Sequence, residues 1–105
     1  MVAQIIWSSE AQKDVDNLAA YIAQDSPAYA ANVVTKILEA VRDLPQHPFI
    51  GRRVPEWEDD TIREVFVYNY RIIYQVPDHT IQILAIIHGK RLLEPILETR
   101  KPKPS

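Results

Sequence analysis

Five side chains in the second half of the sequence could take part in chemistry: Arg63, Arg71, His88, Lys90 and Arg91. An arginine can hold a phosphate or carboxylate group through two parallel hydrogen bonds. A histidine, with an ordinary pKa near 6.5, can transfer protons close to neutral pH. Each residue also has a plainer interpretation, as an ion-paired arginine on a sheet, a hydrogen-bonded histidine at a strand end, or a polar turn. These residue types therefore suit anion binding or proton transfer only if the fold gathers them.

All five lie within residues 62–91, where three apolar runs rich in Ile, Val, Tyr and Phe favour β-strands. The runs are separated and ended by turn residues, namely Asn69, Pro77-Asp78-His79 and Gly89. This pattern predicts a three-stranded antiparallel meander. Side chains two apart share a face, so the third run should carry Ile81, Ile83, Ala85 and Ile87 on one face and Gln82, Leu84, Ile86 and His88 on the other. If the more polar faces of the second and third strands coincide, Arg71 and His88 share a solvent-facing surface.

The residues before the meander predict elements that cover one face of it. Residues 2–7 alternate like a strand, and Ser9 with Gln12 has the form of a capping box that opens a helix. Apolar residues at steps of three and four continue that helix to about residue 24. Ser26 and Pro27 then start a second helix that ends near residue 44, so the two helices form an antiparallel hairpin. Residues 46–61 contain Pro and Gly and predict an irregular segment.

We therefore expect an α+β fold of order β-α-α-β-β-β, with the helix hairpin packed on one face of an antiparallel sheet. A single domain should cover residues 1–98, with a short helix at 92–98 and a disordered tail at 99–105.

Composition excludes several classes of protein. The chain has 105 residues, 47% hydrophobic and 25% charged, which is typical of one globular domain. No apolar run approaches the roughly 20 residues of a membrane span, and we expect no signal peptide and a cytoplasmic location. The net charge of -2 gives no general attraction to polyanions. With no cysteine and three scattered histidines, neither a metal site nor a cofactor is expected.

Several motifs together resemble one family over residues 3–93. They are the DSP helix restart, the HPFIGRRVPE segment, IREV, YRIIYQV and ILAIIHGKR. The chain resembles the RelE/ParE superfamily of toxins from bacterial type II toxin–antitoxin pairs, often described as plasmid stabilisation proteins. The resemblance implies the toxin fold, growth arrest, and a cognate antitoxin partner that folds along the toxin. It also implies that operator DNA is contacted only indirectly, through the antitoxin. Apolar residues beyond the core stripe of the helix hairpin, such as Ala23, Ala31 and Val34, would offer the antitoxin a groove.

The superfamily contains two unlike activities. RelE-like members are ribosome-dependent endoribonucleases that cut mRNA, and the resemblance matches Arg71 and Arg91 to their phosphate-binding arginines, with His88 available for proton transfer. Two lysines of that pattern are replaced here by Ile62 and Glu64, and its tyrosine falls at Leu97.

ParE-like members inhibit DNA gyrase and need no nuclease site. Under this interpretation Arg63, Arg71, Lys90 and Arg91 would contact the target. Because the nuclease set is incomplete, we favour the gyrase inhibitor. The ribosome-dependent nuclease and a degenerate toxin that only binds antitoxin remain as alternatives.

Overall fold

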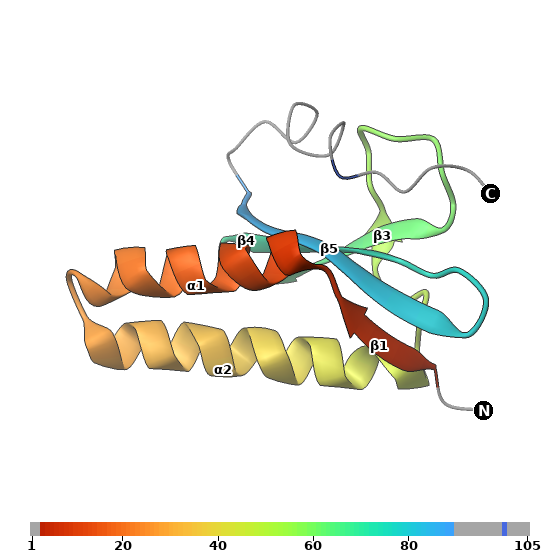
Figure 1. The fold of residues 1–105 in the computed structure, drawn as a ribbon. Helices are drawn as coiled ribbons and strands as arrows, with labels where there is room; N and C mark the ends of the chain where they lie inside the picture. Colours follow the sequence, from red (N-terminus) through yellow and green to blue (C-terminus); the bar gives the residue numbers. More distant parts are fainter. Residues whose placement is uncertain (1–2, 90–99, 101–105) are drawn as a thin grey trace.

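The computed structural model describes residues 3–89 and Arg100 of the 105-residue chain. Two helices cover one face of a five-stranded mixed sheet whose strands lie in the order β1-β5-β4-β3-β2 (Figure 1). In chain order the elements are β1 (Gln4–Trp7), α1 (Ser9–Ala23), α2 (Pro27–Asp43), a short 3-10 helix η1 (Leu44–Gln46), β2 (Arg52–Arg53), β3 (Ile62–Val67), β4 (Tyr70–Gln75) and β5 (Thr80–His88).

The α+β fold with a helix hairpin on one face is confirmed, and two details differ from expectation. The meander β3-β4-β5 is antiparallel, but β1 runs parallel to β5, so the sheet is mixed. Both helices lie between β1 and the other strands along the chain. A connection of this length lets β1 pair parallel to β5, whereas a tight turn would require an antiparallel pair. The second difference is β2, an additional edge strand of two residues inside the segment expected to be irregular.

Both helices begin at serine caps. Ser26 caps α2 as predicted, because its hydroxyl accepts a hydrogen bond from the Tyr29 amide at 3.1 Å. The cap of α1 is Ser8 rather than the predicted Ser9, with the Ser8 hydroxyl 3.0 Å from the Ala11 amide nitrogen. Ser8 is extended, the backbone conformation that a capping residue needs, and it directly follows β1.

The sheet is packed on both faces. The main core lies between the sheet and the helices and includes Val33, Ile37, Ile72, Tyr74 and Ile83. A smaller apolar cluster lies on the opposite face, which we call the open face. Its members are Val54, Ile62, Ile73, Leu84, Ala85 and Ile87, with Trp57 packed against them.

A β-bulge in β5 explains why the open face is so apolar. Ile73 of β4 pairs with Ala85, but the next residue, Tyr74, pairs with Ile83, so Leu84 is an extra residue in β5. The bulge changes the alternation of β5 after Leu84. As a result Ile81 and Ile83 face the helices, whereas Leu84, Ala85 and Ile87 belong to the open-face cluster.

The predicted short helix at residues 92–98 and almost all of the predicted tail at 99–105 lie outside the described residues. Within the described part of the chain, no helix is long and apolar enough to cross a membrane.

Candidate functional site

The open face is centred on Arg71, which β4 presents between Phe66 of β3 and Ile87 of β5. Its side chain is only 7% exposed. Two carboxylates hold the guanidinium. Arg71 Nε donates to Glu64 Oε1 at 2.6 Å, and its two terminal nitrogens donate to the Glu56 oxygens at 2.9 and 3.0 Å. Arg71 is therefore bound on two edges by groups of its own chain.

Glu64 is the most deeply buried charge of this site, because its side chain has no exposed surface. It comes from β3 and lies opposite both Ile73 of β4 and Arg52 of β2. Its second oxygen accepts a hydrogen bond from Arg52 Nε at 2.6 Å. We call these four side chains, Arg52, Glu56, Glu64 and Arg71, the open-face network. Its two positive and two negative charges cancel, so the network presents no net charge to an incoming anion.

Within this network, Arg71 and Glu56 each favour the charged form of the other. The hydrogen bond with Glu56 is the main cause that raises the pKa of Arg71 above its ordinary value, against the opposing effect of burial. The same hydrogen bond lowers the pKa of Glu56. Both members of the pair are therefore held in their charged forms by each other.

Arg63 does not join the network, because adjacent strand residues point to opposite faces. It pairs with Tyr74 on the side of the helices. Its guanidinium lies 5.0 Å from the centre of the Phe49 ring and donates to the carbonyl oxygens of Asp60 and Gly51 at 2.8 and 3.3 Å.

His88 also lies on the opposite face from Arg71. It pairs with Tyr70, whereas Arg71 pairs with Ile87, and residues paired across an antiparallel ladder share a face. The rings of His88 and Tyr70 meet edge to face at 5.6 Å, and burial raises the pKa of the Tyr70 hydroxyl. The expectation of one surface shared by Arg71 and His88 is therefore wrong, and the bulge at Leu84 is the physical reason.

The remaining predicted site residues can be placed only in part. Lys90 and Arg91 lie outside the described residues, as does Leu97. Ile62 is fully buried in the open-face cluster, so the two positions where the nuclease pattern has lysines hold a buried isoleucine and a buried glutamate. A role for Arg63, Arg71, Lys90, Arg91 or His88 in binding or catalysis stays a prediction. Among residues 3–89 and Arg100, no three His, Asp or Glu side chains come together to hold a metal ion.

The two acidic members of the network were not predicted as site residues, and they differ in the signal that each carries in the sequence. Glu56 lies in an acidic loop segment that usually indicates a solvated surface. Glu64 carried a signal, because it lies on a strand between the apolar residues Ile62 and Phe66. A glutamate at a buried strand position is rare unless it is paired, so a basic partner could have been expected.

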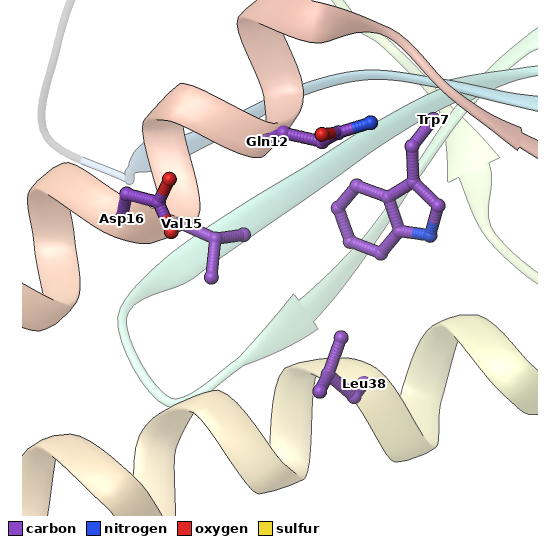
Figure 2. Close-up of a pocket in the computed structure, with 5 residues that line it drawn as sticks. All are labelled: Trp7, Gln12, Val15, Asp16 and Leu38. Atoms are coloured by element: carbon purple, nitrogen blue, oxygen red, sulfur yellow. The ribbon is translucent and has the colours of Figure 1, made fainter.

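A second feature is a groove between the two helices near β1. Figure 2 shows the Trp7 ring between α1 and α2, close to Leu38, with Val15 and Asp16 on the α1 side. The hollow measures about 290 Å³, and a neighbouring hollow of about 350 Å³ shares Trp7 and Leu38. Leu38 is exposed, as expected of a surface that remains uncovered in the single chain.

This groove is not lined by the residues that we expected for antitoxin binding. Ala23 and Val34 are partly buried against the main core, and Ala31 is exposed on α2 without lining either hollow. Trp7, at the end of β1 and directly before the helix hairpin, lines both hollows.

Comparison with known proteins identifies the class to which this fold belongs. Residues 5–93 match the family of the ParE toxin of the type II toxin–antitoxin system parDE. The chain is 34% identical to the toxin RelE2 of Caulobacter vibrioides over 92 residues, covering 87% of this chain and 100% of that protein. It is 30% identical to the putative toxin Y4kP of Sinorhizobium fredii over 89 residues, covering 82% of this chain and 88% of the relative.

Solved structures show the same fold. The chromosomal ParDE system of P. aeruginosa superimposes with a TM-score of 0.70 at 25% identity, covering 85% of this chain and 98% of the other. The free E. coli toxin RelE, in a mutant form, superimposes with a TM-score of 0.62 at 16% identity, covering 86% of each chain. The chain belongs to the RelE/ParE family of type II toxin–antitoxin toxins. Its relatives carry both RelE and ParE names, so the family alone leaves the target open.

Proposed function

We propose that this protein is a ParE-like toxin, which acts in the cytoplasm, inhibits DNA gyrase and is neutralised by a cognate antitoxin. The observation that carries the proposal is the occupation of Arg71 by Glu56 and Glu64. A toxin that acts by surface contact can tolerate an internally paired arginine at this position. A nuclease that uses the arginine on a phosphate cannot.

Phosphate binding at Arg71 would require the loss of contacts that are costly to break. Removing one partner of a buried ion pair costs about 3–5 kcal/mol, because the remaining charge is left without compensation. An incoming phosphate would also be repelled by the carboxylates of Glu56 and Glu64, which lie beside Arg71. The nuclease pattern instead has lysines at the two positions that Ile62 and Glu64 occupy in this chain. Cleavage of RNA needs positively charged groups that stabilise the negative charge of the phosphorane-like transition state. In the open-face network the two arginines are balanced by two glutamates, so no positive charge is left over for this role.

We further propose that the groove of Figure 2 receives the antitoxin. Its lining includes Trp7 beside aliphatic side chains such as Leu38, and tryptophan is among the residues most enriched at the centres of protein interfaces. A helix or extended segment of the antitoxin could bury Trp7 and Leu38 together. The ParDE toxin–antitoxin system of P. aeruginosa and the toxin–antitoxin complex RelBE2 of Mycobacterium tuberculosis, both similar in fold to this chain, support an antitoxin as the partner.

The target is tested with purified toxin in two parallel assays. One measures supercoiling of relaxed plasmid by gyrase, and the other measures mRNA cleavage on programmed ribosomes. We expect loss of supercoiling and intact mRNA. Cut mRNA with active gyrase would instead establish the ribosome-dependent nuclease, in which case the network must open on the ribosome. A toxin that binds its antitoxin but affects neither assay would be the degenerate form.

The groove is tested with Leu38→Glu, which puts a charge beside Trp7. We expect antitoxin affinity to fall at least about tenfold, since an unpaired charge in an apolar interface is costly. Thr35→Glu is the matched control, because Thr35 is also exposed on α2 but does not line the groove. Equal affinities of the two variants would place the antitoxin elsewhere.

A further inference from the structure

Four of the five tyrosines of the chain lie together at the end of the helix hairpin. Tyr21 comes from α1, Tyr29 from α2, Tyr68 from the turn between β3 and β4, and Tyr70 from β4. The ring centres of Tyr29 and Tyr68 are 6.1 Å apart, and Tyr21 and Tyr70 line one hollow of about 360 Å³. Burial raises the pKa of the Tyr70 hydroxyl, and the nearby Tyr29 and Tyr21 hydroxyls raise it further. We call these four side chains the tyrosine surface.

Packing of the core does not account for the position of these rings. Tyr21 is 72% exposed, Tyr29 48% and Tyr68 50%, so each leaves much of its ring in water. Tyr68 also has a φ of 52°, in the left-handed region that suits glycine or asparagine far better than a bulky residue. The side-chain amide of Asn32 donates to the Tyr68 hydroxyl at 3.0 Å and so fixes the ring at the surface. An exposed ring held on a strained backbone is typical of a binding surface.

The tyrosine surface differs from the two exposed phenylalanines, whose rings already lie beside cations of the same chain. The guanidinium of Arg63 is 5.0 Å from the Phe49 ring centre, and that of Arg52 is 5.2 Å from the Phe66 ring centre. Within the described part of the chain, no arginine or lysine lies over a ring of the tyrosine surface. A cation that comes from a partner can therefore take the equivalent position over these rings.

The charge around the tyrosine surface also suits a cation. Residues 9–32, which include α1 and the first turns of α2, contain four acidic residues and one basic residue. Asp14 lines the same hollow as Tyr21 and Tyr70, and it already holds one guanidinium, because Arg100 Nη1 and Nη2 donate to its carboxylate at 2.6 and 3.2 Å. With that pair neutral, three acidic groups remain against one basic group. This excess attracts a cation and repels a phosphate backbone.

We propose that the tyrosine surface binds an arginine side chain presented by a partner protein. The arginine enters the hollow of about 360 Å³, stacks on Tyr21 and donates to the side-chain oxygen of Asn17, which lines the same hollow. Tyr29 and Tyr68 contact the partner residues on either side of it. Arginine fits better than lysine, because its planar and weakly hydrated guanidinium can stack on a ring and donate hydrogen bonds at the same time.

This surface is separate from the groove that we assign to the antitoxin. The two hollows of the groove share Trp7 and Leu38, and neither has a lining residue in common with the hollow at Tyr21 and Tyr70. The proposal does not depend on gyrase being the target, because it is argued from rings and charges on the helix hairpin.

The test titrates the full chain, labelled with ¹⁵N, with the acetylated peptide Gly-Pro-Arg-Pro-Gly. We expect saturable shifts of the Asn17 side-chain amide and of the Tyr21 and Tyr70 backbone amides. The control peptide carries citrulline, an uncharged isostere of arginine, and should bind about fivefold more weakly because the attraction between cation and ring is lost. Equal binding of the two peptides, shifts confined to the groove at Trp7 and Leu38, or no saturable shift would each overturn the proposal.

Two variants of Tyr21 separate stacking on the ring from simple charge attraction. Tyr21→Phe keeps the ring and should bind the arginine peptide within about twofold of the wild type, whereas Tyr21→Leu keeps only apolar bulk and should bind about fivefold more weakly. The side chain is 72% exposed, so neither change disturbs the core. Phe49→Leu, an exposed aromatic change elsewhere, is the matched control and should leave the affinity unchanged. Equal affinities of the Phe and Leu variants, or equally strong binding of spermidine, would refute the arginine site.

Discussion

Replacing Glu64 by Gln should destabilise the fold by about 3 kcal/mol. The glutamate has no exposed surface, and its neighbour Arg71 is 7% exposed, so the contact between them is almost free of solvent screening. Loss of one partner from such a buried pair costs roughly 3–5 kcal/mol. The lower end of that range applies here, because Gln keeps one carbonyl acceptor and Glu56 still binds the other edge of Arg71. The Arg52 contact adds little, since that side chain is mostly in water.

The assay is urea unfolding of the full chain, monitored by circular dichroism. Glu39→Gln is the matched control. Glu39 pairs with Lys36 on the surface of α2 at 3.7 Å, with both side chains about half exposed. Removal of that charge should change the free energy of unfolding by less than about 0.5 kcal/mol. A cycle with Arg71→Met should show coupling on the order of 2 kcal/mol between positions 64 and 71.

An unfolding free energy for Glu64→Gln within about 0.5 kcal/mol of the Glu39→Gln value would refute this reasoning. The reasoning would also be refuted if Glu64→Gln lowered the free energy of unfolding by the same amount in the Arg71→Met variant as in the wild type. Either result would mean that water enters the open-face network and that Arg71 is more available to an external anion than its burial indicates.

Three further predictions follow from single contacts. Gly51→Ala should cost about 1–3 kcal/mol in urea unfolding, because a Cβ there would lie 2.5 Å from the Glu64 carbonyl oxygen; Gly89→Ala, whose nearest atom would be 3.1 Å away, should cost less. The pKa of Glu56 is lowered from 4.5 by Arg71, so its stabilising effect should be complete above about pH 4.5 and disappear as the pH falls through the folded-state value. The unfolding free energies of wild type and Glu56→Gln should therefore converge in acid, and a constant difference down to pH 2 would contradict this. Ser26→Ala should lose about 1 kcal/mol as the α2 cap is removed, and an unchanged midpoint would show that the cap contributes nothing.

Most of the fold could be predicted from local patterns. The period of apolar residues separated helices from strands, and turn residues such as Asn69 and the Ser26-Pro27 start marked the boundaries correctly. These signals depend on neighbours within a few residues, which a single sequence contains.

The features that the sequence could not supply depend on residues far apart in the chain. The bulge at Leu84 is a matter of register between β4 and β5, and nothing in the Ile-rich run marks which residue is extra. It moved His88 to the opposite face from Arg71 and so separated two candidate site residues. The pairing of Arg71 with Glu56 and Glu64 joins residues 15 and 7 positions away along the chain, and it became visible only in three dimensions. β2 escaped prediction because two residues are too few to show alternation.

The most direct test of the proposed function is pulse-labelling of DNA and protein synthesis in bacteria, immediately after induction of this toxin without its antitoxin. Inhibition of gyrase predicts that DNA synthesis falls first while translation continues. An early loss of translation with DNA synthesis still running would contradict the proposal and assign the toxin to the RelE-like nucleases.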